Sequence, residues 1–176
     1  LWGLENEDGE SPQGINSINQ LAFSATDLSP LEGVDISGSD VAQIIYTSGT
    51  TGAPKGVLHT HGSLAAQCTA LMNAWEWSRY DRMYHVLPLH HIHGIVNGWM
   101  CAAAAGATVE FAGDASFAPR AAWSRLRDVD LPPVTIFMGV PTMYVMMLRA
   151  HEGAKRRNRG EAAASAAAAR SLRLTV

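Results

Sequence analysis

The sequence predicts a layered α/β domain in which a mainly parallel sheet is flanked by helices. From residue 41 onwards, short apolar runs of strand length alternate with longer stretches of helical character. Such alternation is typical of a parallel sheet, because each parallel connection crosses over through a helix. The composition is that of an ordinary globular protein, with 47% hydrophobic and 16% charged residues, and 176 residues suffice for one domain with its own core.

The expected elements follow one another regularly after an irregular start. Residues 1–40 are expected to form a loop-rich acidic segment, because Gly, Ser, Pro, Asn and acidic residues dominate it without an apolar period. Residues 41–176 are expected to fold as the α/β domain. Its strand candidates are residues 41–46, 83–87, 107–111, 134–138 and 172–176. Its helix candidates are residues 61–76, 92–104, 118–128, 141–151 and 161–169, the last being rich in alanine, which has the lowest helical cost.

One loop stands out for its chemistry. The stretch Tyr46-Thr-Ser-Gly-Thr-Thr-Gly-Ala-Pro-Lys-Gly56 follows the first strand candidate and combines glycines, hydroxyl residues and one lysine. Glycines let backbone N–H groups converge on an anion, hydroxyl groups add hydrogen-bond donors, and a lysine supplies full positive charge. No Lys or Arg precedes Lys55, so the first cation of the chain lies in this loop. The pattern predicts a phosphate-binding loop with the candidate residues Thr47, Ser48, Gly49, Thr50, Thr51, Gly52, Lys55 and Gly56.

The spacing of this loop excludes three common motifs. A Walker A loop needs four residues between its two glycines, whereas only two residues separate Gly49 from Gly52. The dinucleotide fingerprint G-x-G-x-x-G does not fit Gly49, Gly52 and Gly56. The nucleophile elbow G-x-S-x-G of serine hydrolases is absent as well, since Ser48 directly precedes Gly49.

The loop resembles the phosphate loop of the adenylate-forming enzymes, which include acyl-CoA synthetases, luciferases and peptide-synthetase adenylation domains. Their pattern Thr-Ser-Gly-(Ser/Thr)-Thr-Gly-x-Pro-Lys-Gly is complete between Thr47 and Gly56, and a polar surface turn is the alternative interpretation. A second segment, Leu87-Pro-Leu-His-His-Ile-His-Gly94, resembles the family's Pro-Leu-x-His-x-x-Gly motif. Together with Trp75-Glu-Trp77 before it and residues 134–144 after it, this form resembles the malonyl-CoA synthetase branch.

The resemblance implies a two-step reaction. A carboxylate oxygen would attack the α-phosphorus of ATP, giving an acyl-adenylate and pyrophosphate, and a thiol, usually that of CoA, would then displace AMP. ATP and CoA are therefore implied as substrates, and Mg²⁺ is implied as the metal that accompanies ATP. The phosphate-loop residues would hold the β- and γ-phosphates and stabilise departing pyrophosphate by positioning and charge.

The resemblance also implies roles for residues that follow two later strands. His91 matches the position that lines the acyl pocket and gates the path of the CoA thiol, with a packed core histidine as the alternative. His93 lies outside the general pattern, so a contact to a substrate carboxylate and simple packing are both open. Gly139 is placed beside the acyl pocket, where a ligand or a neighbouring backbone could approach closely. Independently of the family, ligands of parallel sheets bind at the carboxyl ends of strands, where the Thr47 loop and residues 90–93 are both expected.

The histidines suggest a different alternative, a histidine metalloprotein. Four of them fall within nine residues: His85, His90, His91 and His93. Imidazole is a common zinc ligand. However, no Cys or acidic residue lies among the four, and no zinc-helix spacing is present, so no metal site is assigned.

Charge and composition exclude further classes. The formal net charge of −3 and the lack of a basic stripe interleaved with aromatic residues argue against a nucleic-acid partner. The longest apolar run, residues 95–105, contains Asn97 and Gly98 and falls short of the roughly 20 residues of a membrane span. Cys68 and Cys101 are too few for a disulfide scaffold and indicate buried, reduced thiols in an intracellular protein, mitochondrial or cytoplasmic.

The resemblance further implies that residues 41–176 are a partial AMP-binding domain, truncated at its C-terminal end and part of the large N-terminal domain of such an enzyme. Family enzymes carry a further C-terminal domain with a catalytic lysine, so the main catalytic lysine is expected outside this chain. The leading hypothesis is an acyl-CoA synthetase that acts on a small carboxylic acid, with malonate as a candidate. The alternative is a fragment that is inactive or only binds nucleotide. The acid substrate, the oligomeric state and the compartment stay open.

Overall fold

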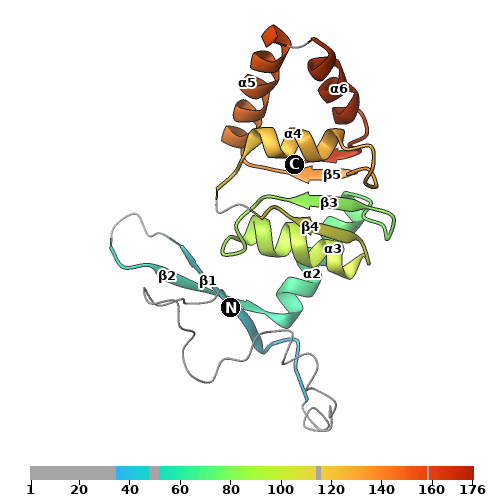
Figure 1. The fold of residues 1–176 in the computed structure, drawn as a ribbon. Helices are drawn as coiled ribbons and strands as arrows, with labels where there is room; N and C mark the ends of the chain where they lie inside the picture. The colour runs from blue at the N-terminus through green and yellow to red at the C-terminus, as the bar shows by residue number, and fades with distance from the viewer. Residues whose placement is uncertain (1–34, 48–51, 114–115, 158) are drawn as a thin grey trace, which may run out of the picture. The chain divides into compact units, whose positions relative to one another are not determined.

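The computed structural model describes residues 35–47, 52–113, 116–157 and 159–176 (Figure 1). The chain divides into two compact units, Leu1–Ile36 and Ser37–Val176, and every helix and strand described below belongs to the second unit. That unit contains a two-stranded hairpin and a four-stranded sheet flanked by helices.

The four-stranded sheet is parallel and confirms the predicted fold class. Its strands are β3 (Arg82–His85), β4 (Thr108–Phe111), β5 (Ile136–Met138) and β6 (Leu174–Thr175). They lie in the order β4-β3-β5-β6, and each neighbouring pair runs parallel. The register pairs His85 with Met138, so the ends of β3 and β5 lie level at the carboxyl edge of the sheet.

Helices cover both faces of this sheet (Figure 1). One face is covered by α2 (His61–Ala74), the π-helix η2 (His93–Met100) and α3 (Cys101–Ala104). The other face is covered by α4 (Pro119–Arg127), α5 (Pro141–Arg157) and α6 (Arg159–Ala169). Successive strand residues point to opposite faces, so Ile136 and Met138 pack into the first core and Phe137 into the second. Cys68 and Cys101 are buried in the first core as free thiols.

The predicted helices are present, but their ends differ from the predictions. The candidate at residues 92–104 is divided into η2 and α3. The candidate at residues 141–151 continues to Arg157. None of the helices within the described residues combines the length and apolar character that crossing a membrane requires.

The first strand candidate, residues 41–46, does not join the parallel sheet, which corrects the prediction. β1 (Val41–Thr47) pairs antiparallel with β2 (Lys55–Thr60), a strand that was not predicted, in a separate two-stranded sheet. The cause is the length of the connection. Residues 48–54 are fewer than the dozen or so that a parallel crossover needs, so the chain turns back on itself. Among the described phosphate-loop candidates, Thr47 therefore ends one hairpin strand and Lys55 begins the other, away from the carboxyl edge of the parallel sheet.

The hairpin is hydrogen-bonded to the start of α2. Thr60 ends β2 and caps the helix, because its Oγ1 accepts a hydrogen bond from the Ser63 N–H at 3.1 Å. In return, the Thr60 N–H donates to Ser63 Oγ at 3.0 Å, which completes a capping box. The Gly62 N–H donates to the Gly38 carbonyl oxygen at 2.7 Å. These bonds join the base of the hairpin to the helices of the parallel sheet.

A buried carboxylate ties together the amino ends of three strands. Asp81 is 3% exposed and immediately precedes β3. It accepts hydrogen bonds from Arg173 Nε at 2.6 Å, just before β6, and from Thr135 Oγ1 at 2.8 Å, just before β5. Burial alone would raise the pKa of Asp81, but hydrogen bonds from Arg173, Ser78 and Thr135 outweigh it and lower the pKa to about 2. The carboxylate is therefore ionised at neutral pH and holds the three strand starts in register.

Two glycines let the π-helix η2 pack closely against Pro88 and against the residues of β3. A Cβ at Gly94 would lie 2.3 Å from the Pro88 carbonyl oxygen, a clash with backbone that cannot rotate away. A Cβ at Gly98 would lie 3.0 Å from Met83 Cε and 3.1 Å from His85 Cε1. The two glycines thus set how closely η2 approaches Pro88 and the end of β3, and packing explains the last residue of the motif.

We expect Gly94→Ala to lower the free energy of unfolding by about 1–3 kcal/mol, because the added methyl overpacks the contact with Pro88. Gly153→Ala in α5 is the control, since nothing lies within 4 Å of a Cβ at that position and alanine favours a helix interior by about 1 kcal/mol. Denaturant unfolding followed by circular dichroism measures both variants. A midpoint for Gly94→Ala equal to that of the unsubstituted chain would contradict the packing explanation.

Candidate functional site

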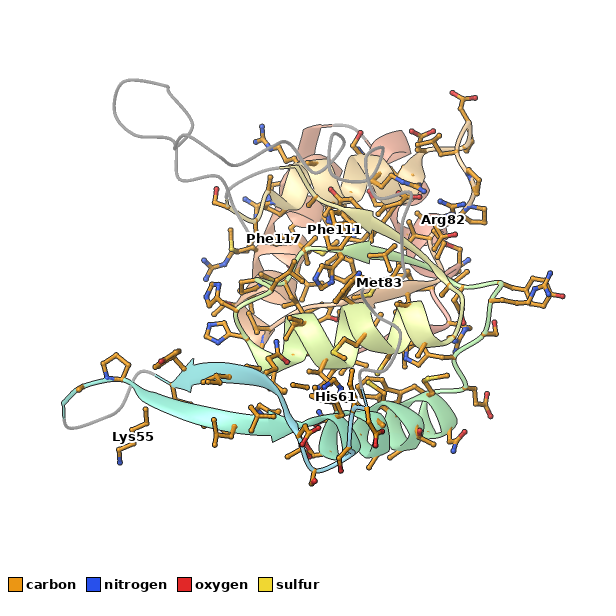
Figure 2. All side chains as sticks on the ribbon, turned by 90° about the horizontal axis from the view of Figure 1, so that it is seen from below. Lys55, His61, Arg82, Met83, Phe111 and Phe117 are labelled. Carbon is orange, nitrogen blue, oxygen red and sulfur yellow. The ribbon has the colours of Figure 1, made fainter. Side chains whose placement is uncertain are left out.

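The tip of the β1–β2 hairpin carries the described part of the predicted phosphate loop. Thr47 ends β1 and pairs in register with Lys55, which begins β2, and Thr47 Oγ1 donates a hydrogen bond of 3.4 Å to the Lys55 carbonyl oxygen. Both residues are exposed, as are Gly52 and Gly56. Figure 2 shows the Lys55 side chain extending from the hairpin near its tip. Four candidates lie outside the described residues: Ser48, Gly49, Thr50 and Thr51.

The ammonium group of Lys55 has no carboxylate partner in the part of the chain that the structure describes. The ion pairs found there are Arg82–Glu110, Arg125–Glu110 and Arg173–Asp81. An exposed ammonium beside a threonine hydroxyl and a glycine-containing turn suits an anionic ligand, because charge and hydrogen bonds act on the same oxygen atoms. The described hairpin residues therefore fit a phosphate group.

Glycine is favoured at positions 52 and 56 of the loop for two different structural reasons. Gly52 has a φ angle of 155°, which L side chains rarely adopt, and nothing lies within 4 Å of a Cβ at this position. Backbone conformation therefore favours glycine there. At Gly56, a Cβ would lie 3.0 Å from Ile44 Cγ2 and 3.5 Å from the Tyr46 ring. Gly56 thus leaves room for side chains of β1 on the same face of the hairpin.

The other predicted site residues gather at the carboxyl edge of the parallel sheet. His91 is exposed, and its ring centroid lies 4.3 Å from that of His90. His93 begins η2 and is partly buried, which lowers its pKa. Its Nε2 is buried without a hydrogen-bond partner. Gly139 directly follows β5, whose end is level with the end of β3. The histidine segment therefore follows β3 at the carboxyl edge, as predicted, and Gly139 lies at the end of the neighbouring strand on the same edge.

The turn at Gly139 is held by a hydrogen bond to the carbonyl oxygen of Val176, which follows β6, and Tyr144 of α5 donates to the same oxygen. The Gly139 N–H donates to the Val176 carbonyl oxygen at 2.8 Å, and Tyr144 Oη donates to the same oxygen at 2.9 Å. A Cβ at Gly139 would meet its nearest neighbour, Tyr144 Cε2, at 3.4 Å, which is an ordinary contact. Glycine here leaves space beside Tyr144 and does not relieve a clash.

The two groups of candidates are not joined by hydrogen bonds among the described residues. No hydrogen bond there links Thr47 or Lys55 to residues 90–93 or to Gly139. The hairpin reaches the parallel sheet through α2. The expectation that both groups lie at carboxyl ends of strands in one sheet is therefore correct for the histidine segment and wrong for the Thr47 loop.

His85 is a further residue of this edge, for which the sequence suggested only the metal-binding alternative. It ends β3, is 2% exposed, and both of its ring nitrogens are buried without a hydrogen-bond partner. Its ring meets the Phe111 ring edge-on, with centroids 5.2 Å apart. Burial, and to a lesser extent the neighbouring His93, lowers the pKa of His85 to about 4. The sequence contains one indication of this burial. His85 occupies a position of the strand where the alternating pattern favours an apolar, inward-facing side chain.

A groove of about 500 Å³ lies between β1, α2 and η2 and has mostly apolar walls. None of the predicted site residues lines it. The lining residues are Ala42, Gln43, His61, Leu64, Ala65, Cys68, Ile95, Trp99, Met100 and Ala104. This groove therefore does not coincide with the residues predicted to bind the acyl group.

The clustered histidines do not form a metal centre in the part of the chain that is described. No group of three or more His, Cys, Asp or Glu side chains there could hold a metal ion. His85 is buried at the end of β3, while His90 and His91 are exposed. This arrangement does not favour the metalloprotein alternative.

Comparison with known proteins adds independent findings. Residues 4–176 match the family described as AMP-binding enzyme. The chain is similar to the mitochondrial malonate–CoA ligase ACSF3 of Xenopus laevis, with 49% identity over 111 residues that cover 63% of this chain and 19% of that protein.

Two solved structures resemble the fold. One is a malonyl-CoA ligase in a ternary product complex with methylmalonyl-CoA and AMP, at 34% identity and a TM-score of 0.64, covering 79% of this chain and 27% of that one. The other is ATP-bound MatB from Rhodopseudomonas palustris, at 27% identity and a TM-score of 0.63, covering 81% of this chain and 25% of that one. The chain thus spans between 19% and 27% of the length of these three proteins.

We expect the free energy of unfolding to fall as the pH drops from 6.5 to about 4. In this window the unfolded chain binds a proton at His85 that the folded chain resists, so stability is lost with a slope of up to about 1.4 kcal/mol per pH unit. The lowered pKa of His93 acts in the same direction. Denaturant unfolding at a series of pH values measures the slope. His85→Phe should show a shallower dependence, and equal slopes in the two proteins would contradict the assignment.

Proposed function

Because the chain belongs to the family of AMP-binding enzymes, we propose that it forms the phosphate-binding hairpin and part of the acyl pocket of an ATP-dependent acid–thiol ligase. The proposed enzyme activates a carboxylic acid as its acyl-adenylate with release of pyrophosphate, and then transfers the acyl group to the thiol of CoA with release of AMP. The observation that carries the proposal is the hairpin tip, where Lys55 faces Thr47 and has no acidic partner among the described residues.

The hairpin is proposed to hold the β- and γ-phosphates of ATP. The attacking carboxylate and the triphosphate are both anionic and repel each other, so positive charge near the departing pyrophosphate lowers the barrier. Lys55 would supply that charge, and Thr47 would supply a hydroxyl donor. The remaining loop residues would add further hydroxyl and backbone N–H donors: Ser48, Gly49, Thr50, Thr51, Gly52 and Gly56. All of these groups stabilise charge, and none of them attacks the substrate.

Mg²⁺ is proposed to arrive with ATP and to be held through phosphate oxygens. Mg²⁺ keeps several of its waters and is commonly bound by one or two carboxylates together with substrate phosphates.

The carboxyl edge of the sheet is proposed to form part of the acyl pocket. His91 is exposed, so its ring could line the pocket and gate the path of the CoA thiol without displacing core atoms. His93 is partly buried at this edge, so one of its ring nitrogens could hydrogen-bond an acid carrying a second polar group. Gly139, directly after β5, would form part of the pocket wall, and its lack of a side chain would leave room for the acyl group.

Malonate is proposed as the acid because the similar proteins are named malonate–CoA ligase and malonyl-CoA ligase. The partners would then be malonate, ATP and CoA, all small molecules. An intracellular location is proposed on the free, buried cysteines and on the mitochondrial name of the Xenopus laevis relative.

For the 176 residues alone, the second candidate function is nucleotide binding without turnover. The observation that favours it is that the chain covers 19% of the Xenopus laevis relative. The described residues would supply contacts for phosphate and for part of an acyl pocket, whereas adenylate formation also needs groups that hold the adenine and orient the acid.

A segment exchange tests the proposed function. Residues 41–176 would replace the matching segment of an active malonate–CoA ligase, and malonate-dependent exchange between ATP and pyrophosphate would be measured. We expect the hybrid enzyme to retain exchange, and Lys55→Met to reduce it by about 10²–10³-fold because a charge near the leaving group is lost. Lys155→Met is the matched control, since Lys155 is exposed on α5 on the opposite side of the sheet from η2.

Two outcomes would contradict the proposal. One is a folded hybrid, judged by cooperative unfolding, that shows no exchange with malonate or with other short acids. The other is a Lys55→Met hybrid whose exchange rate equals that of the Lys155→Met control.

A further inference from the structure

Within the described part of the chain, three imidazole nitrogens at the carboxyl edge of β3 are buried without a hydrogen-bond partner. They are Nδ1 and Nε2 of His85 and Nε2 of His93. Leaving a buried polar atom unpaired costs about 1–3 kcal/mol, and such atoms in native proteins are normally paired. Three of them at one sheet edge therefore mark a place where a small hydrogen-bonding molecule would be held.

The His85 ring is fixed by its packing and directed at η2. Phe111 meets it edge-on, at an interplanar angle of 87°, from the neighbouring strand β4. On another side lies Gly98, where a Cβ would come within 3.1 Å of His85 Cε1 and 3.3 Å of His85 Nδ1. The edge of the ring that carries Nδ1 therefore faces the helix that begins with His93.

The two histidines interact within this partly apolar setting. Burial lowers the pKa of both rings, and the nearby His93 lowers that of His85 a little further. At neutral pH both are thus uncharged, and a neutral imidazole has one donor nitrogen and one acceptor nitrogen. The hydrogen bond made by one nitrogen decides which nitrogen carries the proton. A partner shared by the two rings would therefore couple the tautomer of one to that of the other.

We propose that His85 is a positioning residue that fixes the orientation and tautomer of His93 through one shared water molecule. A water makes two to four hydrogen bonds, enough to serve a nitrogen of each ring. His85 does not contact the substrate in this arrangement and acts through His93 alone. Its effect on catalysis rests on the proposed function, in which His93 contacts the acid.

A purely structural role for His85 predicts a different response to substitution. If the ring only fills space beside Phe111 and Gly98, then His85→Phe removes two unpaired polar atoms at little change in shape. Such a replacement is neutral or stabilising. Stability at neutral pH therefore cannot separate the two roles, whereas the tautomer of His93 can.

The first test follows His93 in the complete chain by ¹⁵N NMR of the histidine rings at neutral pH. We expect one dominant His93 tautomer in the unsubstituted chain, a change of about tenfold in the tautomer ratio in His85→Phe, and recovery in His85→Gln, which keeps a donor and an acceptor. His151→Phe is the matched control, because His151 also has an unpartnered buried nitrogen but lies on α5 against the other face of the sheet. An unchanged His93 tautomer in His85→Phe would overturn the proposal.

The second test measures kinetics in the hybrid ligase. We expect His85→Phe to raise the KM for malonate about 10- to 100-fold, as expected for a displaced contact group, while the KM for ATP changes by less than about twofold. An unchanged KM for malonate would overturn the positioning role. A hybrid without malonate-dependent exchange, combined with a shifted His93 tautomer in the chain, would count against the proposed function and leave the positioning of His93 supported.

Discussion

The placement of the residues at the carboxyl edge of the sheet depends on an ion pair at the opposite edge. Asp81, just before β3, accepts hydrogen bonds from Arg173 and from Thr135, which precede β6 and β5. Asp81 is buried whereas the Arg173 side chain is 35% exposed. Removing Arg173 or Thr135 would leave the buried carboxylate with fewer partners, so this contact favours one alignment of the strand starts. Strands have a nearly constant rise per residue, so aligned starts give aligned ends. His85 consequently lies level with Met138.

At that aligned edge, η2 is positioned by residues without side chains. Gly94 lets the helix approach the backbone of Pro88, and Gly98 lets it approach the ring of His85. The same close packing that stabilises the helix also buries the imidazole nitrogens of His85 and His93. The burial of these nitrogens therefore results from the packing of the Leu87–Gly94 motif itself. The close approach that Gly94 allows also sets the environment of His93.

Structural features with a local physical cause could be predicted from the sequence. Features that depend on contacts between distant segments of the chain could not. The parallel sheet and its helices were predictable, because each element carries its own apolar pattern. β2 was not, because Lys55 and Gly56 are weak strand formers that become a strand only by pairing with β1. The phosphate loop and the histidine motif were recognisable by residue type. The burial of His85 was not, since Phe111 and Gly98 come from other elements of the chain.

The hairpin has the proposed function only if the ammonium of Lys55 contacts the outer phosphates of a nucleotide. Calorimetric titration of the hybrid ligase with MgATP and with AMP, each with and without Lys55→Met, tests this most directly, because AMP lacks those phosphates. A charge-assisted hydrogen bond contributes about 1.5–3 kcal/mol, so we expect the substitution to weaken MgATP binding by about tenfold or more. AMP binding should change by less than about twofold. An equal loss for both nucleotides, or no loss for MgATP, would contradict the phosphate contact.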